Sequence, residues 1–213
     1  MIMHLALYRF IRNSLIFGCL LLALTVNVHA SDQKILVLGD SISAAYGMSL
    51  EQGWGAQLAS ELQARDPGIN VINASISGDT TAGGRNRLPA LLQQHQPQLV
   101  VIELGGNDAL RGTPIQVIRN NLSAMVEQSQ QAGADVLLLG MQIPPNYGAA
   151  YTQAFANVFQ QVSDAHDALL VPFLLEGIAT QPQMMQADGI HPTATAQSIM
   201  MEAVWSQLKN WIN

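Results

Sequence analysis

The stretch that decides the fold is "KILVLGDSISAAYG", residues 34–47. Residues 34–39 read as an apolar strand of the kind that is covered on both faces in a parallel sheet. The run ends in a carboxylic acid, Asp40, and a hydroxyl, Ser41, and small residues follow. Such a serine belongs either to an ordinary strand-to-helix turn or to a turn that presents it for chemistry. Only the second possibility requires partner residues elsewhere in the chain.

The same pattern of a short apolar run followed by a longer helical segment repeats along the chain. Strands are expected at 34–39, 69–75, 98–105, 135–142 and 168–173, and helices at 53–65, 87–95, 115–133, 151–166 and 193–211. This alternation predicts βαβ units and an α/β fold of three layers (α/β/α), with a parallel sheet of about five strands. Ligands of such sheets bind beyond the carboxyl ends of the strands. Polar residues at those ends are therefore the candidates for function.

The first thirty residues differ from the rest. Arg9 and Arg12 precede an apolar run over residues 15–26, and "VHA" at 28–30 has the small-x-small form of a cleavage site. The run is too short for a membrane-spanning helix, which needs roughly 20 residues. We therefore expect a signal peptide over residues 1–30, cleaved after Ala30.

Export would carry a single domain, residues 31–213, to the periplasm or the medium without a stable membrane anchor. An uncleaved anchor and a lipoprotein site at Cys19 are the alternatives. No apolar surface stripe requires a dimer, so we expect a monomer.

Composition narrows the possible functions. The chain has 15 Asp and Glu residues against 9 Lys and Arg, a net charge of −6. Loss of Arg9 and Arg12 with the leader makes it more acidic still, which disfavours nucleic acid as a partner. Cys19 is the only cysteine, so the mature chain has no thiolate nucleophile. We expect no metal site and no cofactor.

A serine nucleophile needs a base within hydrogen-bond reach. His191 stands in "ADGIHPTA", three residues after Asp188, and Gly189 permits a tight turn that brings the two side chains together. Pro192 would suit the first position of the closing helix. Two interpretations of Asp188 and His191 are possible. Either the carboxylate orients the histidine as a general base, or the segment is a helix N-cap in which the aspartate is incidental. The remaining histidines of the mature chain stand near helix ends and are expected at the surface: His95 and His166.

Acyl transfer also needs donors for an oxyanion. Gly78, in "ISGDT", follows the second expected strand and allows close backbone approach, and Asn107, in "ELGGND", follows the third. Each is an ordinary turn when taken alone. Together with Ser41 and the Asp188–His191 pair, they supply every part of an acyl-transfer site from loops at one edge of the sheet.

These residues resemble the SGNH hydrolases, also called the GDSL esterase/lipase family. "GDSIS", "SGDT", "GGND" and "DGIHP" match its blocks in order and span nearly the whole mature chain. Longer stretches, "NASISGDT", "VIELGGNDALRG" and "QADGIHP", are similar to the exported bacterial acyl-CoA thioesterase I group, whose members are also described as lysophospholipases and arylesterases.

The resemblance implies a role for each matched residue. Ser41 would be the nucleophile, His191 the general base and acid, and Asp188 the residue that orients His191. The backbone N–H groups of Ser41 and Gly78 and the side chain of Asn107 would form the oxyanion hole. Two further acids would be structural: Asp40 and Asp108. The resemblance implies no metal or organic cofactor.

The expected substrate is a small-molecule acyl ester or thioester. The loops 107–114 and 142–148 could line an acyl site, and the candidate contacts are Leu110, Ile143, Pro144 and Tyr147. The alternatives are a short-chain or carbohydrate acetyl esterase on the same fold, and an exported binding protein without turnover. A flavodoxin-like nucleotide-binding protein is disfavoured, because "GDTTAGG" is not a phosphate-binding loop of the G-x-x-x-x-G-K-[ST] type.

Overall fold

The computed structural model describes residues 33–209, 211 and 212, within the unit that spans Asp32–Asn213. The signal peptide expected over residues 1–30 lies outside the described residues. No helix in the described part is long and apolar enough to cross a membrane.

The centre of the fold is a sheet of five parallel strands in the order β2-β1-β3-β4-β5. The strands are β1 (Gln33–Gly39), β2 (Ile69–Asn73), β3 (Leu99–Glu103), β4 (Asp135–Leu139) and β5 (Leu169–Val171). The second strand, β2, lies on one side of β1, and the third strand, β3, lies on the other side. The switch point of the sheet, where such folds bind ligands, therefore lies between β1 and β3.

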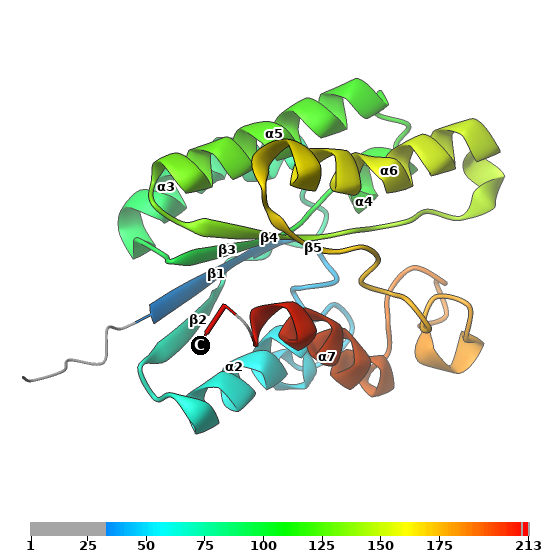
Figure 1. Ribbon diagram of the computed structural model, residues 1–213. Coiled ribbons are helices and arrows are strands. Elements are labelled where there is room, and N and C mark those ends of the chain that lie inside the picture. The colour runs from blue at the N-terminus through cyan, green and yellow to red at the C-terminus, as the bar shows by residue number, and fades with distance from the viewer. Residues whose placement is uncertain (1–32, 210, 213) are drawn as a thin grey trace, which may run out of the picture. The chain divides into compact units, whose positions relative to one another are not determined.

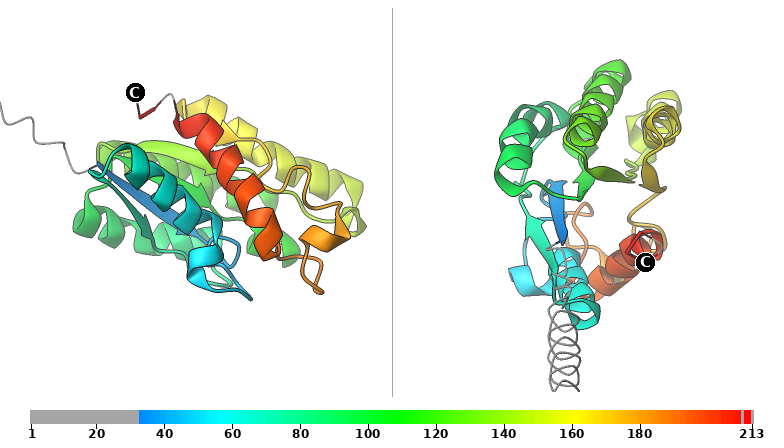
Figure 2. Two further views of the ribbon diagram at one scale, coloured as in Figure 1. Left: turned by 90° about the horizontal axis from the view of Figure 1, so that it is seen from below. Right: turned by 60° about the vertical axis from the view of Figure 1, so that its left-hand side comes forward.

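Helices cover both faces of the sheet (Figures 1 and 2). One layer contains α3 (Thr81–His95), α5 (Ile115–Gln131) and α6 (Ala149–His166), and the other contains α2 (Trp54–Arg65) and α7 (Gln197–Leu208). The predicted three-layer parallel fold is confirmed. In Figure 1 the strands run from left to right, so the segment between β5 and α7 lies beyond their carboxyl ends.

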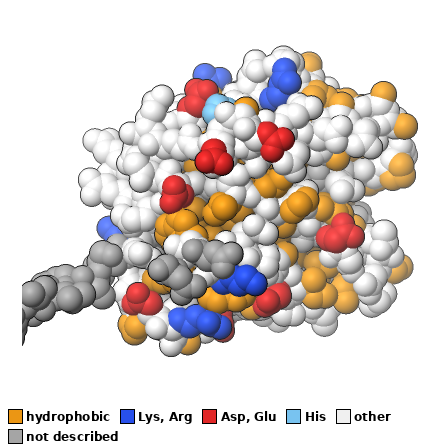
Figure 3. Space-filling model, in the orientation of Figure 1, with side chains coloured by type: hydrophobic (Ala, Val, Ile, Leu, Met, Phe, Trp, Pro, Cys, Tyr) orange, Lys and Arg blue, Asp and Glu red, His pale blue; other side chains and the backbone are white. Residues whose placement is uncertain are grey.

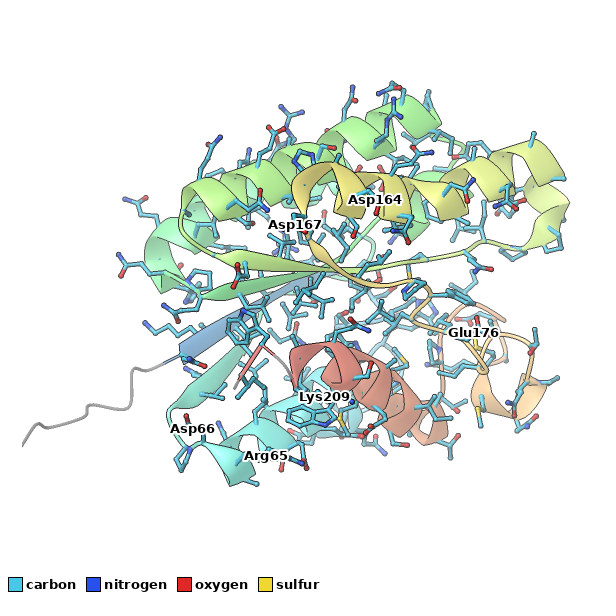
Figure 4. All side chains as sticks on the ribbon, in the orientation of Figure 1. Arg65, Asp66, Asp164, Asp167, Glu176 and Lys209 are labelled. Atoms are coloured by element: carbon cyan, nitrogen blue, oxygen red, sulfur yellow. The ribbon has the colours of Figure 1, made fainter. Side chains whose placement is uncertain are left out.

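The core fills the space between these layers. Every residue of β3 is buried, and the largest fully buried side chains come from helices on both faces: Trp54, Phe155 and Phe159. Most charged side chains lie outside the core, such as Asp164 and Glu176 in Figure 4, and the buried acids among the described residues are Asp40, Glu103 and Asp108. On the face drawn in Figure 3, acidic and basic side chains are dispersed. The Arg65 guanidinium lies 4.4 Å from the centroid of the Trp205 ring and so connects α2 with α7.

One helix begins earlier than the sequence predicts. α3 starts at Thr81 rather than Arg87, and Pro89 lies inside it. The side chain of Thr80 caps the helix by accepting the N–H of Gly83 at 3.2 Å. A Cβ on Gly84 would stand 2.2 Å from Leu104 Cδ1, so the glycine that weakens the sequence signal is what lets the helix approach β3.

The closing helix begins later than predicted. α7 starts at Gln197, after a 3-10 turn η4 (Ala194–Ala196). The expectation that Pro192 opens this helix is wrong, because Pro192 pairs with Met185 in an antiparallel bridge. This bridge closes the loop that carries His191. A short helix that the sequence did not predict, α4 (Gly106–Leu110), follows β3.

Candidate active site

Ser41 lies in a tight turn that directly follows β1. The carbonyl of Asp40 accepts the N–H of Ala44 at 2.9 Å, and that of Ser41 accepts the N–H of Tyr46 at 3.0 Å. Ala45 has φ of 57°, in the left-handed region that residues with a side chain seldom adopt. Strained backbone of this kind is concentrated at functional sites.

His191 and Asp188 stand together opposite this turn. His191 Nε2 is 2.9 Å from Ser41 Oγ, and His191 Nδ1 is 2.6 Å from Asp188 Oδ2. The other oxygen of Asp188 accepts the N–H groups of Ile190 and His191 at 2.9 and 3.0 Å. Gly189 makes the turn with φ of 68°. The hydrogen bond from the imidazole, helped by the two backbone N–H groups, lowers the pKa of Asp188 to about 2.

Gln186 connects the loop of His191 to the turn of Ser41. It is the first residue of the quoted stretch "QADGIHP", but that stretch by itself assigns it no role. Its Nε2 donates to the carbonyls of Tyr46 at 2.8 Å and Pro192 at 3.0 Å. Its backbone N–H donates to the carbonyl of His191 at 2.7 Å. The ring of Tyr46 also packs on the imidazole, with 4.3 Å between centroids. These contacts fix the distance between the hydroxyl and the base.

Asn107 projects from α4 to the end of β1. Its Nδ2 donates to Asp40 Oδ2 at 2.9 Å, while Asp40 Oδ1 accepts the N–H of Ile42 at 3.0 Å. Asp40 is 2% exposed and holds Asn107 rather than the imidazole. The carboxylate in contact with His191 is that of Asp188.

Gly78 lies in the loop between β2 and α3, with φ of 80°. Its carbonyl accepts from Arg111 Nη2 at 3.3 Å. The loop is fixed by an ion pair of 2.8 Å between Arg87 and Asp79. Within the described part of the chain, the backbone N–H groups of Gly78 and Ser41 donate to no other protein group.

Asp108 has a structural position, as the resemblance implied. It is 3% exposed and accepts the backbone N–H of Thr81 at 2.8 Å and its hydroxyl at 2.6 Å. Asn121 donates to the same hydroxyl at 3.1 Å. The network joins the start of α3 to α4, and so joins the loop of Gly78 to the helix of Asn107.

The four candidate acyl contacts are not equivalent. Leu110, at the end of α4, is half-buried, and Ile143 is only 9% exposed within the core. Pro144 is exposed, and Tyr147, in the 3-10 turn η2 (Pro145–Tyr147), is 40% exposed. The two remaining histidines are the last residues of α3 and α6: His95 and His166. Over residues 33–209, no group of three His, Cys, Asp or Glu side chains is arranged to hold a metal ion.

A hydroxyl, an imidazole and a carboxylate in one hydrogen-bonded chain, at the switch point of a parallel sheet, define a serine hydrolase. Residues 37–199 match the model of the GDSL-like Lipase/Acylhydrolase family. The chain belongs to this family, as its motifs predicted, and is an ester hydrolase.

Curated relatives and a solved structure agree with this assignment. Esterase TesA of Pseudomonas aeruginosa is 51% identical over 93% of this chain and 98% of its own length. Thioesterase 1/protease 1/lysophospholipase L1 of Escherichia coli is 42% identical over 91% of each chain. The crystal structure of TesA superposes with a TM-score of 0.81 over 84% of this chain and 99% of that chain, at 52% identity.

Proposed function

We propose that this protein hydrolyses ester and thioester bonds of acyl substrates through an acyl-enzyme on Ser41. The observation that carries the proposal is the continuous chain from Ser41 Oγ to His191 Nε2 and from Nδ1 to Asp188, at 2.9 and 2.6 Å. A hydroxyl with such a base is an activated nucleophile, and a carboxylate on the far nitrogen sets the tautomer that can accept its proton.

The proposed reaction has two steps. Ser41 Oγ attacks the acyl carbonyl carbon while His191 Nε2 takes the hydroxyl proton, and Asp188 stabilises the resulting imidazolium. The bond to the alcohol or thiol then breaks, and His191 gives its proton to the leaving group. In the second step His191 takes a proton from water, whose oxygen attacks the acyl carbon. The bond from that carbon to Ser41 Oγ then breaks, His191 returns the proton to Oγ, and the acid leaves.

The negative oxygen of each tetrahedral intermediate would be held by three donors. They are the backbone N–H groups of Ser41 and Gly78 and the side-chain amide of Asn107. The two N–H groups make no competing protein hydrogen bond among the described residues, and Asp40 fixes the amide. Donors held in place before the reaction stabilise developing charge without reorganisation.

For the substrate, we propose medium to long acyl chains carried as small-molecule esters or thioesters. The names of the relatives, an esterase and a thioesterase/lysophospholipase, support both leaving groups. Leu110, Pro144 and Tyr147 are the more accessible of the four candidate contacts, since Ile143 is largely packed into the core.

We further propose that the enzyme is exported, loses residues 1–30 and acts in the periplasm as a monomer without a membrane anchor. The basic and apolar pattern before Ala30 supports this. The N-terminal sequence of the protein recovered from a periplasmic extract tests it: a mature chain that begins at Ser31 is expected, and an intact leader would contradict the proposal. Size-exclusion chromatography with light scattering tests the monomer.

Hydrolysis of p-nitrophenyl esters from acetate to palmitate, with a lysophospholipid and an acyl-CoA, tests the activity. Turnover that rises with chain length and is lost in Ser41→Ala is expected. Turnover confined to acetate would instead favour the short-chain or carbohydrate acetyl esterase. Absence of turnover, or activity that survives the substitution, would contradict the proposed function.

A further inference from the structure

Glu103 is a buried acid that the proposed mechanism does not use. It is the last residue of β3, has 0% exposure, and is paired in register with Gly39, the last residue of β1. Its Oε2 accepts the backbone N–H of Asp40 at 3.2 Å and the hydroxyl of Ser43 at 2.8 Å. Asp40 and Ser43 stand on either side of Ser41 in the sequence, so the carboxyl of Glu103 contacts the turn over residues 40–46 on both sides of Ser41. We call this segment the serine turn.

The turn is packed closely against this carboxyl. A Cβ on Gly39 would stand 2.9 Å from Glu103 Oε2 and 2.7 Å from Ser43 Oγ. The space between the first strand, the turn and the end of β3 is therefore filled by the glutamate and its partners. A change in the size or hydrogen bonding of this side chain must be transmitted to Asp40 or Ser43.

Glu103 and Asp40 bring two buried carboxyl groups together. Burial raises the pKa of Glu103 well above its usual value, and the charge of Asp40 raises it further. Burial raises the pKa of Asp40 as well, although the N–H donors from Ile42 and Asn107 oppose this rise. Because the rise is larger at Glu103, Glu103 keeps a proton more readily than Asp40 does, and Asp40 Oδ2 is free to accept the Asn107 amide.

We propose that Glu103 is a positioning residue of the oxyanion hole, which fixes Asp40 and the serine turn so that Asp40 orients the amide of Asn107. The chain of contacts runs from Glu103 Oε2 to the backbone of Asp40, and from Asp40 Oδ2 to Asn107 Nδ2. The inference rests on the proposed function, since it assumes that Asn107 binds the oxyanion.

Substitutions of Glu103 separate positioning from a purely structural role. Glu103→Gln keeps an oxygen that can accept from Asp40 and Ser43 and places N–H where the neutral acid holds its proton. Glu103→Met keeps the volume and loses the acceptor. For a p-nitrophenyl ester, we expect kcat of Glu103→Met to fall about 10- to 100-fold with KM little changed, the range for a misplaced catalytic group. Glu103→Gln should recover most of this loss, and Glu127→Met, at an exposed glutamate of α5, is the control.

A double-mutant cycle with Asn107→Ala identifies the route of the effect. If Glu103 acts through Asn107, adding Glu103→Met to Asn107→Ala should slow kcat by less than about 2-fold, because coupled residues are not additive. If the fold-losses in kcat of the two single variants instead multiply in the double variant, the inference is overturned. Wild-type kcat in a folded Glu103→Met enzyme would overturn it as well. If Glu103→Met does not fold, Ser43→Ala replaces it in the cycle, with a smaller loss expected and the same criterion for non-additivity. Wild-type kcat in Asn107→Ala alone would instead contradict the proposed oxyanion hole.

Discussion

His191 Nε2 lies 2.9 Å from Ser41 Oγ although 150 positions separate the two residues in the chain. Neither residue is held by a regular element, because Ser41 lies in a turn and His191 in a loop closed by the Met185–Pro192 bridge. The distance is therefore maintained by the loop contacts themselves. Substitutions in these contacts should change catalysis before they change the stability of the fold.

Asp188→Asn tests the orientation of the base. The amide can keep an oxygen for the N–H groups of Ile190 and His191, but its NH₂ group cannot accept a hydrogen bond from the Nδ1–H of the imidazole. We expect kcat to fall by about 10³- to 10⁴-fold, as in serine proteases that lose the triad carboxylate, with little change in the thermal midpoint. Asp164→Asn, at an exposed residue of α6, is the matched control. A loss of less than tenfold would argue against this role.

The acid side of the pH–rate profile should not report Asp188. Its pKa of about 2 keeps the carboxylate charged over the whole range in which the protein can be assayed, so the loss of its charge should not shape the profile there. We therefore expect kcat/KM of the wild-type enzyme, measured against pH, to show no acid limb with a midpoint near the pKa of Asp188. A limb with a midpoint near pH 2 in the wild-type enzyme would show that Asp188 controls it.

Gln186→Ala tests the connection between the two loops. It removes two donated hydrogen bonds, each of which contributes about 1 kcal/mol net, and frees Tyr46 and Pro192 to separate. We expect kcat to fall on the order of 10-fold or more, since small displacements of catalytic groups are costly. Gln183→Ala, whose side chain donates only to Gln181, should retain wild-type kcat. Equal activity in both variants would mean that the connection does not position His191.

Glu103 should make the stability of the protein depend on pH. In the unfolded chain the carboxyl of Glu103 loses its proton near pH 4.5. In the folded protein burial raises its pKa, so the carboxyl keeps the proton to a much higher pH. The native state then binds the extra proton, so the stabilisation is complete below pH 4.5 and is lost as pH rises towards the folded pKa, by up to about 1.4 kcal/mol per pH unit. Urea unfolding from pH 4.5 to 8 measures this slope. Glu103→Gln should flatten it, and an unchanged slope in that variant would assign the dependence to other groups.

Gly84→Ala tests the close approach of α3 to β3. The new methyl group would stand 2.2 Å from Leu104 Cδ1 and 3.2 Å from Met125 Sδ, which requires repacking in a filled core. We expect the free energy of unfolding to drop by about 1–3 kcal/mol, despite the better helix propensity of alanine. Ala82→Ser, on the exposed side of the same helix, is the control. Stabilisation by Gly84→Ala would show that the core has room there.

Much of this molecule could be predicted from the sequence because its signals are local. Each strand is an apolar run, and the candidate site residues stand in short motifs directly after strands or in a tight turn. The order β2-β1-β3-β4-β5 brings those motifs to one edge. What the pattern could not supply is the start of α3, since the cap at Thr80 is followed by a glycine pair that usually weakens a helix.

The supporting residues were missed because their roles exist only in three dimensions. Gln186 opens the stretch "QADGIHP", but the stretch alone indicates no role for a glutamine, and its partner Tyr46 is 140 positions away. Glu103 did carry a signal, an acid at the end of the apolar run "LVVIEL". A charge at a position that the strand pattern predicts to be buried could have been interpreted as a group with a specific partner.

The most direct test of the central claim is to map the residue that an organophosphonate ester modifies, by mass spectrometry of the digested mature protein. A hydroxyl activated by His191 should form one covalent adduct, on Ser41, and the adduct should be absent from Ser41→Ala and form far more slowly in His191→Ala. An adduct on another residue, or equal labelling of Ser41 without His191, would contradict the assignment of Ser41 as the activated nucleophile.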